Sequence, residues 1–238
     1  MRETTACSRE LGYELRHRRE LVGLTALDLA ERMGWTQSKI SRLETGVRSA
    51  SETDVVQYLA HLGYPVQEMQ PLRALCRHAG RDLGYWLATP HSLTFHETRA
   101  NHITSYHPDE IPRPLRTGDD SPQPRTPTRQ YLIGEQAIRR DATLEQVLKL
   151  LLLADLPHLT IQAVPDTEPY GGAFQIMEFR LNPPLVHVQA HAMRLTLEEE
   201  SYTLPYLALV NRITHQATDP EGTRALLVEL ASYHQLTA

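Results

Sequence analysis

The sequence predicts an α+β protein with an N-terminal all-α domain of about five helices and a C-terminal domain that combines a small antiparallel sheet with flanking helices. Three features carry this prediction. Apolar residues recur at helical spacing in the first third of the chain, whereas the second half mixes helical stretches with segments of two-residue period. A proline-rich stretch separates the two. We therefore predict a helical domain at 1–88, a connecting segment at 89–130 and an α+β domain at 131–238.

Four short helices are predicted between Ser8 and Leu62, because glycine interrupts the helical pattern at regular intervals. The interruptions lie at Gly23, Gly34, Gly46 and Gly63. The first helix is expected to end near Val22. The other three start at hydroxyl residues that can cap a helix, namely Thr25, Thr36 and Ser51. A fifth helix is predicted from about Glu68 to Leu87, where leucine and alanine recur at spacings of three and four.

The linker is recognised by its proline content. Six prolines lie between His107 and Thr128, and no regular helix or strand tolerates that density. Beyond it, apolar runs and two-residue alternation predict further elements. These are a helix at 144–154, strands at 159–164, 173–180 and 185–190, and helices at 201–216 and 221–233.

Composition indicates a water-soluble globular protein. Of the 238 residues, 41% are hydrophobic and 22% charged, and no uninterrupted apolar run reaches the roughly 18 residues that a membrane span requires. The first ten residues carry charges where a signal peptide would be apolar, so we expect a cytoplasmic protein. Cys7 and Cys76 are too few for a disulfide framework and form no metal-binding pair.

Charge is unevenly distributed along the chain. Residues 1–50 hold nine Lys/Arg against seven Asp/Glu, residues 51–90 hold three against four, and residues 91–238 hold twelve against eighteen. The net charge of −5 therefore arises in the second half, and the first half is weakly basic. One copy of such a surface would bind a polyanion only modestly, which favours a dimer that presents two copies.

The stretch 26–44 meets the steric demands of two helices that cross at a tight turn. Ala30 is small enough to let the second helix approach, and Gly34 can adopt the left-handed conformation that ends the first helix. Ile40 and Leu43 then face the core.

The polar residues of the second helix follow from the same arrangement. Thr36 is placed to cap this helix, which leaves Gln37 and Ser38 on its first turn. Arg42 lies about one turn later on the same exposed face. In a helix-turn-helix, this end of the second helix enters the major groove of DNA.

This pattern resembles the Xre and phage-repressor class of helix-turn-helix proteins, in which alanine is followed by glycine four residues later and by a β-branched residue six residues after that. Here these are Ala30, Gly34 and Ile40, and the run 41–46 is also similar to the class. The resemblance implies a sequence-specific DNA-binding transcriptional regulator that reads an operator through helix 36–45.

The resemblance also implies roles for single residues. Gln37, Ser38 and Arg42 fall on base-reading positions. Residues near the phosphate backbone are Thr36, Lys39, Thr45 and Arg48. Arg19 and Glu44 resemble the class's internal ion pair, which braces the first helix against the recognition helix. One departure is Ala26, which stands where the class usually has a glutamine that contacts phosphate, so the resemblance does not extend to that anchoring hydrogen bond but does extend to the fold.

A second resemblance covers much of the remaining chain, on Tyr106-His107-Pro108, Ile111-Pro112 and the stretches 156–162 and 172–179. These segments are similar to WhiJ-like regulators of actinobacteria, whose C-terminal domain is of uncharacterised function. The resemblance implies control of development or secondary metabolism, with a small acidic companion protein or a small-molecule effector. Those proteins normally have a longer helical stretch after the Ile-Pro segment, whereas here a proline-rich insert leads straight to 129–131.

Other kinds of site were considered. His187 and His191 share one strand face with Gln189, but two histidines lack the third and fourth ligands of a zinc site, so we expect no metal. Catalytic motifs such as GxSxG or a phosphate-binding glycine loop are missing, so we expect neither an enzyme nor a cofactor. The aromatic residues Tyr131, Tyr170 and Phe174 are candidates for a ligand pocket, although aromatic residues in strands more often belong to the core.

The leading hypothesis is a homodimer on double-stranded DNA, whose second domain dimerises and senses a ligand or partner. Its two recognition helices would then lie about one DNA turn apart, roughly 34 Å. The alternative is a protein-interaction or antitoxin-like module that acts mainly through a protein partner.

Overall fold

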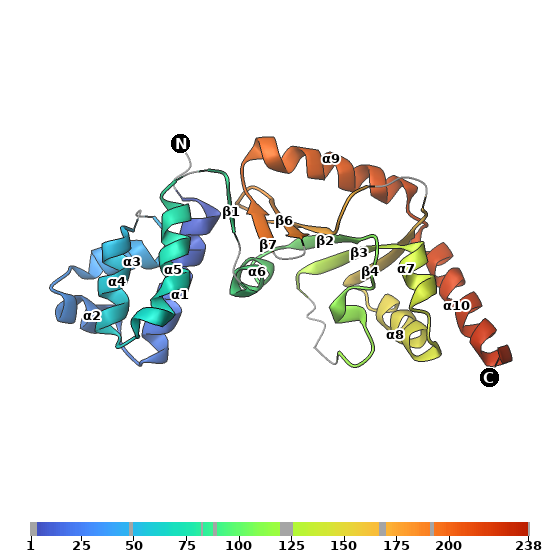
Figure 1. Cartoon of the computed structure of the whole chain (residues 1–238), viewed down its shortest axis with the longest axis horizontal. Helices are drawn as coiled ribbons and strands as arrows, with labels where there is room; N and C mark the ends of the chain where they lie inside the picture. Colours follow the sequence, from blue (N-terminus) through green and yellow to red (C-terminus); the bar gives the residue numbers. More distant parts are fainter. Residues whose placement is uncertain are drawn as a thin grey trace. The chain divides into compact units, whose positions relative to one another are not determined.

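The computed structural model describes residues 4–47, 50–81, 83–87, 90–119, 126–166, 170–190 and 193–237. The chain divides into two compact units, Met1–Ser92 and Leu93–Ala238, and each is described by itself (Figure 1). The α+β class expected from the sequence is confirmed.

The first unit contains the five expected helices. They are α1 (Ala6–Leu21), α2 (Ala26–Met33), α3 (Gln37–Glu44), α4 (Glu52–His61) and α5 (Val66–Ala79), followed by the short strand β1 (Tyr85–Leu87). Thr25, Thr36 and Ser51 are the N-caps of α2, α3 and α4, and each hydroxyl accepts a hydrogen bond from the backbone N–H three residues later. The capping signals in the sequence therefore locate these helix starts to the residue.

The fifth helix is shorter than predicted. It ends at Ala79, Leu83 is exposed, and Tyr85–Leu87 form a strand. Gly84 adopts a positive φ of 72°, which a helix cannot contain, and the apparent helical spacing out to Leu83 was therefore coincidental. The N-terminal part of the prediction holds, since Leu72 and Leu75 are buried.

The helices of this unit share one core. Helix α1 lies against α3 and α5, and α4 contacts α2 and α5 (Figure 1). The apolar side chains that fill the core come from every helix. The largest fully buried ones on the helices are Leu15, Leu29, Ile40, Tyr58 and Leu59, and Trp86 of β1 is buried as well. Because α3 is packed from behind by α1 and α2, only its outer side is open to solvent.

Helix α6 (Pro90–Glu97) crosses the division between the units, and the second unit is built on a mixed sheet. Its strands are β2 (His102–His107), β3 (Thr128–Gly134), β4 (Leu159–Val164), β5 (Phe174–Glu178), β6 (Leu185–Ala190) and β7 (Met193–Leu197). Its other helices are α7 (Glu135–Arg140), α8 (Leu144–Ala154), α9 (Glu200–Gln216) and α10 (Pro220–Thr237), with a 3₁₀ turn η1 (Arg113–Leu115).

Within this unit the strands lie in the order β7-β6-β5-β2-β3-β4. Strands β2, β3 and β4 are parallel neighbours, whereas β2, β5, β6 and β7 pair antiparallel. The sheet is therefore mixed, not purely antiparallel as expected. The segment 89–130, interpreted as a connection, supplies the central strand β2. This strand is buried on both faces, so it lacks the two-residue period by which strands were recognised.

Each face of the sheet is covered by different helices. On one face α9 packs against a core that includes Leu132, Ile176 and Val186 (Figure 1). On the other face α7, α8 and α10 cover a core that includes Ile133 and Ile161. Within the described ranges, none of the helices combines the length and the apolar character that a membrane span requires.

Candidate nucleic-acid interface

The turn between α2 and α3 has the geometry that the sequence anticipates. Gly34 ends α2 in the left-handed conformation, with φ 64° and ψ 27°, at no steric cost because it has no Cβ. The Thr36 hydroxyl accepts a hydrogen bond of 3.2 Å from the backbone N–H of Lys39. Ala30, Ile40 and Leu43 are all buried. The backbone and the core together hold α3 in a defined orientation.

The outer side of α3 is open to solvent. Gln37, Ser38 and Arg42 are all exposed, and Arg42 reaches back along the helix, where its Nε donates to the Ser38 carbonyl at 3.3 Å. The amide and guanidinium ends therefore lie on one accessible surface near the N-terminal turns of α3. This is the placement that reading of base edges requires.

The residues expected near phosphates lie on the flanks of the same helix. Thr36 and Thr45 are exposed, and the Thr45 hydroxyl donates to the Ser41 carbonyl at 2.9 Å. Arg48 lies outside the described residues.

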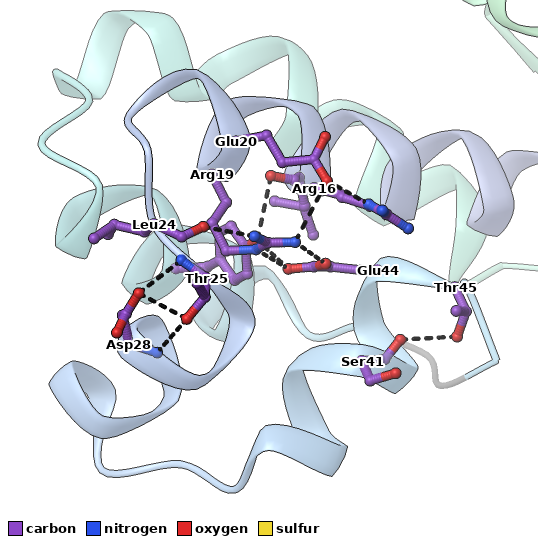
Figure 2. A network of polar contacts seen from close by, with 11 residues as sticks. Arg16, Arg19, Glu20, Leu24, Thr25, Asp28, Ser41, Glu44 and Thr45 are labelled. Atoms are coloured by element: carbon purple, nitrogen blue, oxygen red, sulfur yellow. Dashed lines mark hydrogen bonds and ion pairs between the residues drawn. The ribbon is translucent and has the colours of Figure 1, made fainter.

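An ion pair joins the first helix to the end of α3 (Figure 2). Arg19 donates through Nε and Nη2 to the two carboxylate oxygens of Glu44, each at 2.7 Å, and through Nη1 to the Leu24 carbonyl at 2.6 Å. The Tyr58 hydroxyl from α4 donates to Glu44 Oε1 at 2.6 Å. The two charged side chains are only 8% and 6% exposed, so this fork of charge-assisted bonds ties three helices together.

Electrostatics keep Tyr58 and Arg19 protonated, as hydrogen-bond donors to Glu44. Burial, and then the adjacent Glu44 carboxylate, raise the pKa of the Tyr58 phenol far above its usual range, so the hydroxyl stays protonated and donates. The hydrogen bonds with Glu44 raise the pKa of Arg19 despite its burial. Neither Tyr58 nor Arg19 therefore changes its protonation state near neutral pH.

Lys39 has a partner inside the protein. Its ammonium lies 2.7 Å from Asp54 Oδ1 and 3.3 Å from the centre of the Trp35 ring. Asp54 also belongs to the capping box of α4, formed with Ser51. Burial alone would raise the pKa of Asp54, but the hydrogen bonds from Lys39 and Ser51 outweigh it, so the pKa is lowered and the carboxylate stays ionised. The positive charge of Lys39, expected near phosphate, is thus neutralised by α4.

Three contributors to this surface were not found from the sequence. Tyr58 and Asp54 act from α4, fourteen and fifteen residues from their partners, and no short-range spacing reveals such pairs. At Gly12 on α1, an added Cβ would lie 2.6 Å from the Glu44 carbonyl oxygen, so only glycine allows the two helices to approach this closely.

The three aromatic residues considered for a ligand pocket belong to two different cores, although Tyr131 and Phe174 each also line one of two cavities that share several lining residues. Tyr131 belongs to the core beneath α8, whereas Tyr170 and Phe174 belong to the core beneath α9, on the other face of the sheet. Tyr170 and Phe174 both pack against Tyr106, with ring centres 6.1 and 5.6 Å apart. Tyr170 and Phe174 thus form an aromatic cluster within the core.

Metal ligands do not gather in the part of the chain that the structure describes, where no group of three or more His, Cys, Asp or Glu is placed to hold an ion. His187 is buried, and its Nδ1 lies 3.3 Å from the Thr196 hydroxyl. His191, the other member of the pair considered from the sequence, lies outside the described residues.

The arrangement of α2, the turn and α3 defines the class of protein: a helix-turn-helix protein. Comparison of the sequence with known protein families agrees with this class. Residues 10–72 match a family described as a helix-turn-helix domain, and residues 121–229 match a domain of unknown function, DUF5753. The first unit is thus similar to helix-turn-helix domains, and much of the second unit is similar to DUF5753 domains. No curated protein matches it.

Two solved structures are similar in part. The clp gene regulator ClgR from C. glutamicum is 25% identical over 31% of this chain and 90% of its own, with a TM-score of 0.26. TrmBL2, an archaeal chromatin protein described as having a novel mode of DNA binding, is 12% identical over 87% of this chain and 93% of its own, with a TM-score of 0.36. At these TM-scores neither likeness bears on the placement of the sites.

Proposed function

We propose that the protein is a sequence-specific transcriptional regulator that reads operator DNA through α3 in the major groove. The observation that carries this proposal is the exposure of Gln37, Ser38 and Arg42 on one face of a helix whose opposite side is fixed by buried contacts. Gln can bond an adenine edge twice and Arg a guanine edge twice, and each good pair contributes roughly 1 to 3 kcal/mol of discrimination.

The phosphate contacts are assigned to the flanks of the same helix. Thr36, Thr45 and Arg48 are proposed to contact the backbone, as the resemblance to the Xre class implies. Lys39 is assigned a positioning role, because its charge is already paired with Asp54. Because residues 1–50 hold nine Lys/Arg against seven Asp/Glu, a single copy would bind DNA weakly. Binding as a homodimer to two half-sites about one DNA turn apart, roughly 34 Å, would supply the missing affinity.

The second domain is proposed to dimerise and to sense a small-molecule effector or a small acidic companion protein. The support is the resemblance of its segments to WhiJ-like regulators, together with the DUF5753 match over residues 121–229. Control of development or secondary metabolism is proposed on the same resemblance.

The experiment that tests DNA reading is a genome-wide pull-down of bound DNA, with a Gln37→Ala/Arg42→Ala double variant as the control. The wild-type protein should enrich a small set of sites that share a pseudo-palindromic sequence, and the double variant should lose that enrichment. In purified form, Arg42→Ala should lose affinity for the operator but not for random DNA.

The alternative function, a protein-interaction or antitoxin-like module, is favoured by the acidic balance of residues 91–238. It predicts that no DNA sequence is enriched and that one protein co-purifies with the chain instead. An equal loss of specific and random DNA binding in Arg42→Ala would also contradict base reading by this residue.

A further inference from the structure

A row of polar side chains crosses the sheet of the second unit where apolar core is expected. Register places Ser105 of β2 opposite both Tyr131 and Gln175, Gln175 opposite His187, and His187 opposite Thr196. These five residues, here called the polar row, share one face of the strands β3, β2, β5, β6 and β7. All are buried except Gln175, which is half-buried.

The neighbouring positions show where this polar surface ends. In one direction along the same face, the next side chains of the central strands are Ile103, Met177 and Leu185, and all three are buried. In the other direction, His107 and Gln189 continue the polar surface. The opposite face carries the apolar core beneath α9. Burial of polar groups has a free-energy cost unless each is hydrogen-bonded, so a buried polar row amid apolar neighbours calls for a specific cause.

The internal hydrogen bonds use only part of the row's capacity. Gln175 donates to Glu97 of α6 at 2.8 Å, and Ser105 donates to Gln175 over a long 3.5 Å. Ser105 can still accept, and the Gln175 amide retains a second N–H. Beside the row, at the end of β2, the buried Nδ1 of His107 has no hydrogen-bond partner among the described residues. Burial lowers the pKa of His107 to about 4, so its ring is neutral at pH 7.

This face is hollowed between α6 and the loop that follows β2. Two adjoining cavities of about 390 and 440 Å³ share the lining residues Leu93, His107, Glu110, Gln175 and Gln189. We call their union the α6 groove. Its floor includes most of the polar row, and each cavity falls within the usual size range of small-molecule sites, about 300 to 1,000 Å³.

The charges around the α6 groove largely cancel one another. Four arginines line it, and three are paired within the chain: Arg129 with Glu97 at 3.4 Å, Arg113 with Asp119 at 3.3 Å, and Arg116 with Glu110. Only Arg194 has no ion-pair partner among the described residues. An anion would therefore meet few free cations, whereas a neutral ligand meets many groups that both donate and accept.

We propose that the α6 groove binds a small uncharged molecule rich in hydroxyl or amide groups, held by hydrogen bonds to Ser105, His107, Gln175 and Gln189, and that this molecule is the effector of the regulator. The effector role rests on the proposed function, whereas the binding site does not. Helix α6 offers a route for the signal. It supplies Leu93 and Glu97 to the groove and crosses the division between the two units, so a ligand that competes for Glu97 would act on the segment that joins them.

The test is titration calorimetry on the full chain in the absence of DNA. The probes are a panel of uncharged sugars, polyols and primary amides, and a matched panel of sugar phosphates and sugar acids. Each compound that binds is then titrated into Gln189→Ala and His107→Phe, and into Gln136→Ala as the matched control on the exposed side of α7. Gln189 is exposed, so its replacement should leave folding intact, which the melting temperature checks.

We expect at least one uncharged compound to bind, with a Kd about tenfold weaker in Gln189→Ala and unchanged in Gln136→Ala. The proposal is overturned if no uncharged compound binds, if only the acids bind, or if both groove variants bind like the wild type. Operator binding is measured separately. If the chain binds a ligand but shows no preference for any DNA sequence, the proposed binding site in the α6 groove is supported and the proposed function as a transcriptional regulator is refuted.

Discussion

Replacement of Glu44 by glutamine is expected to destabilise the helix-turn-helix unit by about 3 to 5 kcal/mol, the usual cost of removing one partner of a buried ion pair. Glu44 accepts two bonds from Arg19 and one from Tyr58, all at 2.7 Å or less. Glutamine preserves the size of the side chain, but its NH₂ group would face the donors of Arg19. The guanidinium, only 8% exposed, would then keep as its counter-charge only the half-exposed Glu20 carboxylate, 3.8 Å away.

The chain offers a selective probe for this measurement. Its two tryptophans, Trp35 and Trp86, both lie in the first unit, so urea unfolding followed by tryptophan fluorescence reports on that unit alone. A matched control is Arg16→Gln, which breaks the Arg16–Glu20 pair on α1. Those side chains are 59% and 49% exposed, and such a pair contributes about 0.5 kcal/mol or less.

An intermediate variant tests how the stabilisation is distributed. Tyr58→Phe removes one hydrogen bond to a charged group and should cost about 1.5 to 3 kcal/mol. If Glu44→Gln destabilises the unit no more than Arg16→Gln does, the cluster is not what holds α3 in place.

Three further outcomes are expected. Asp54→Asn should release Lys39 to DNA and steepen the dependence of log Kd on log salt concentration by about 0.9 per protomer. Lys39→Ala should leave this slope unchanged. A flatter slope in Lys39→Ala would instead place this lysine on a phosphate. Lowering the pH from 6.5 towards 4 should reduce the free energy of unfolding of the second unit, because over this range His107 takes up a proton only when the unit is unfolded. Calorimetry should show a shallower pH dependence of stability in His107→Gln than in the wild type. An equal pH dependence in the two proteins would contradict this. Gly12→Ala should cost about 1 to 3 kcal/mol in the tryptophan-monitored assay, because its Cβ meets the carbonyl of Glu44; unchanged stability would show that α1 can move aside.

Strand β2 and the polar row of the α6 groove were not predicted from the sequence, for physical reasons. Strand β2 carries no two-residue period because it is buried on both faces, and its place between β3 and β5 depends on partners more than 20 residues away. The polar row exists only once five strands are in register. Single residues such as Ser105 and Gln175 look unremarkable in the sequence, and only their alignment makes them a surface.

Local chemistry was enough where a feature depends on neighbours within one helical turn. A hydroxyl that caps the N–H three residues later, as at Thr25 and Thr36, or a left-handed glycine such as Gly34, is determined by the adjacent backbone, so the sequence alone located the helix-turn-helix and the exposed face of its recognition helix. The tertiary structure decided which distant charges meet: Tyr58 on Glu44, and Asp54 on Lys39. Those contacts depend on how helices pack, and packing distances are not encoded in any short spacing along the chain.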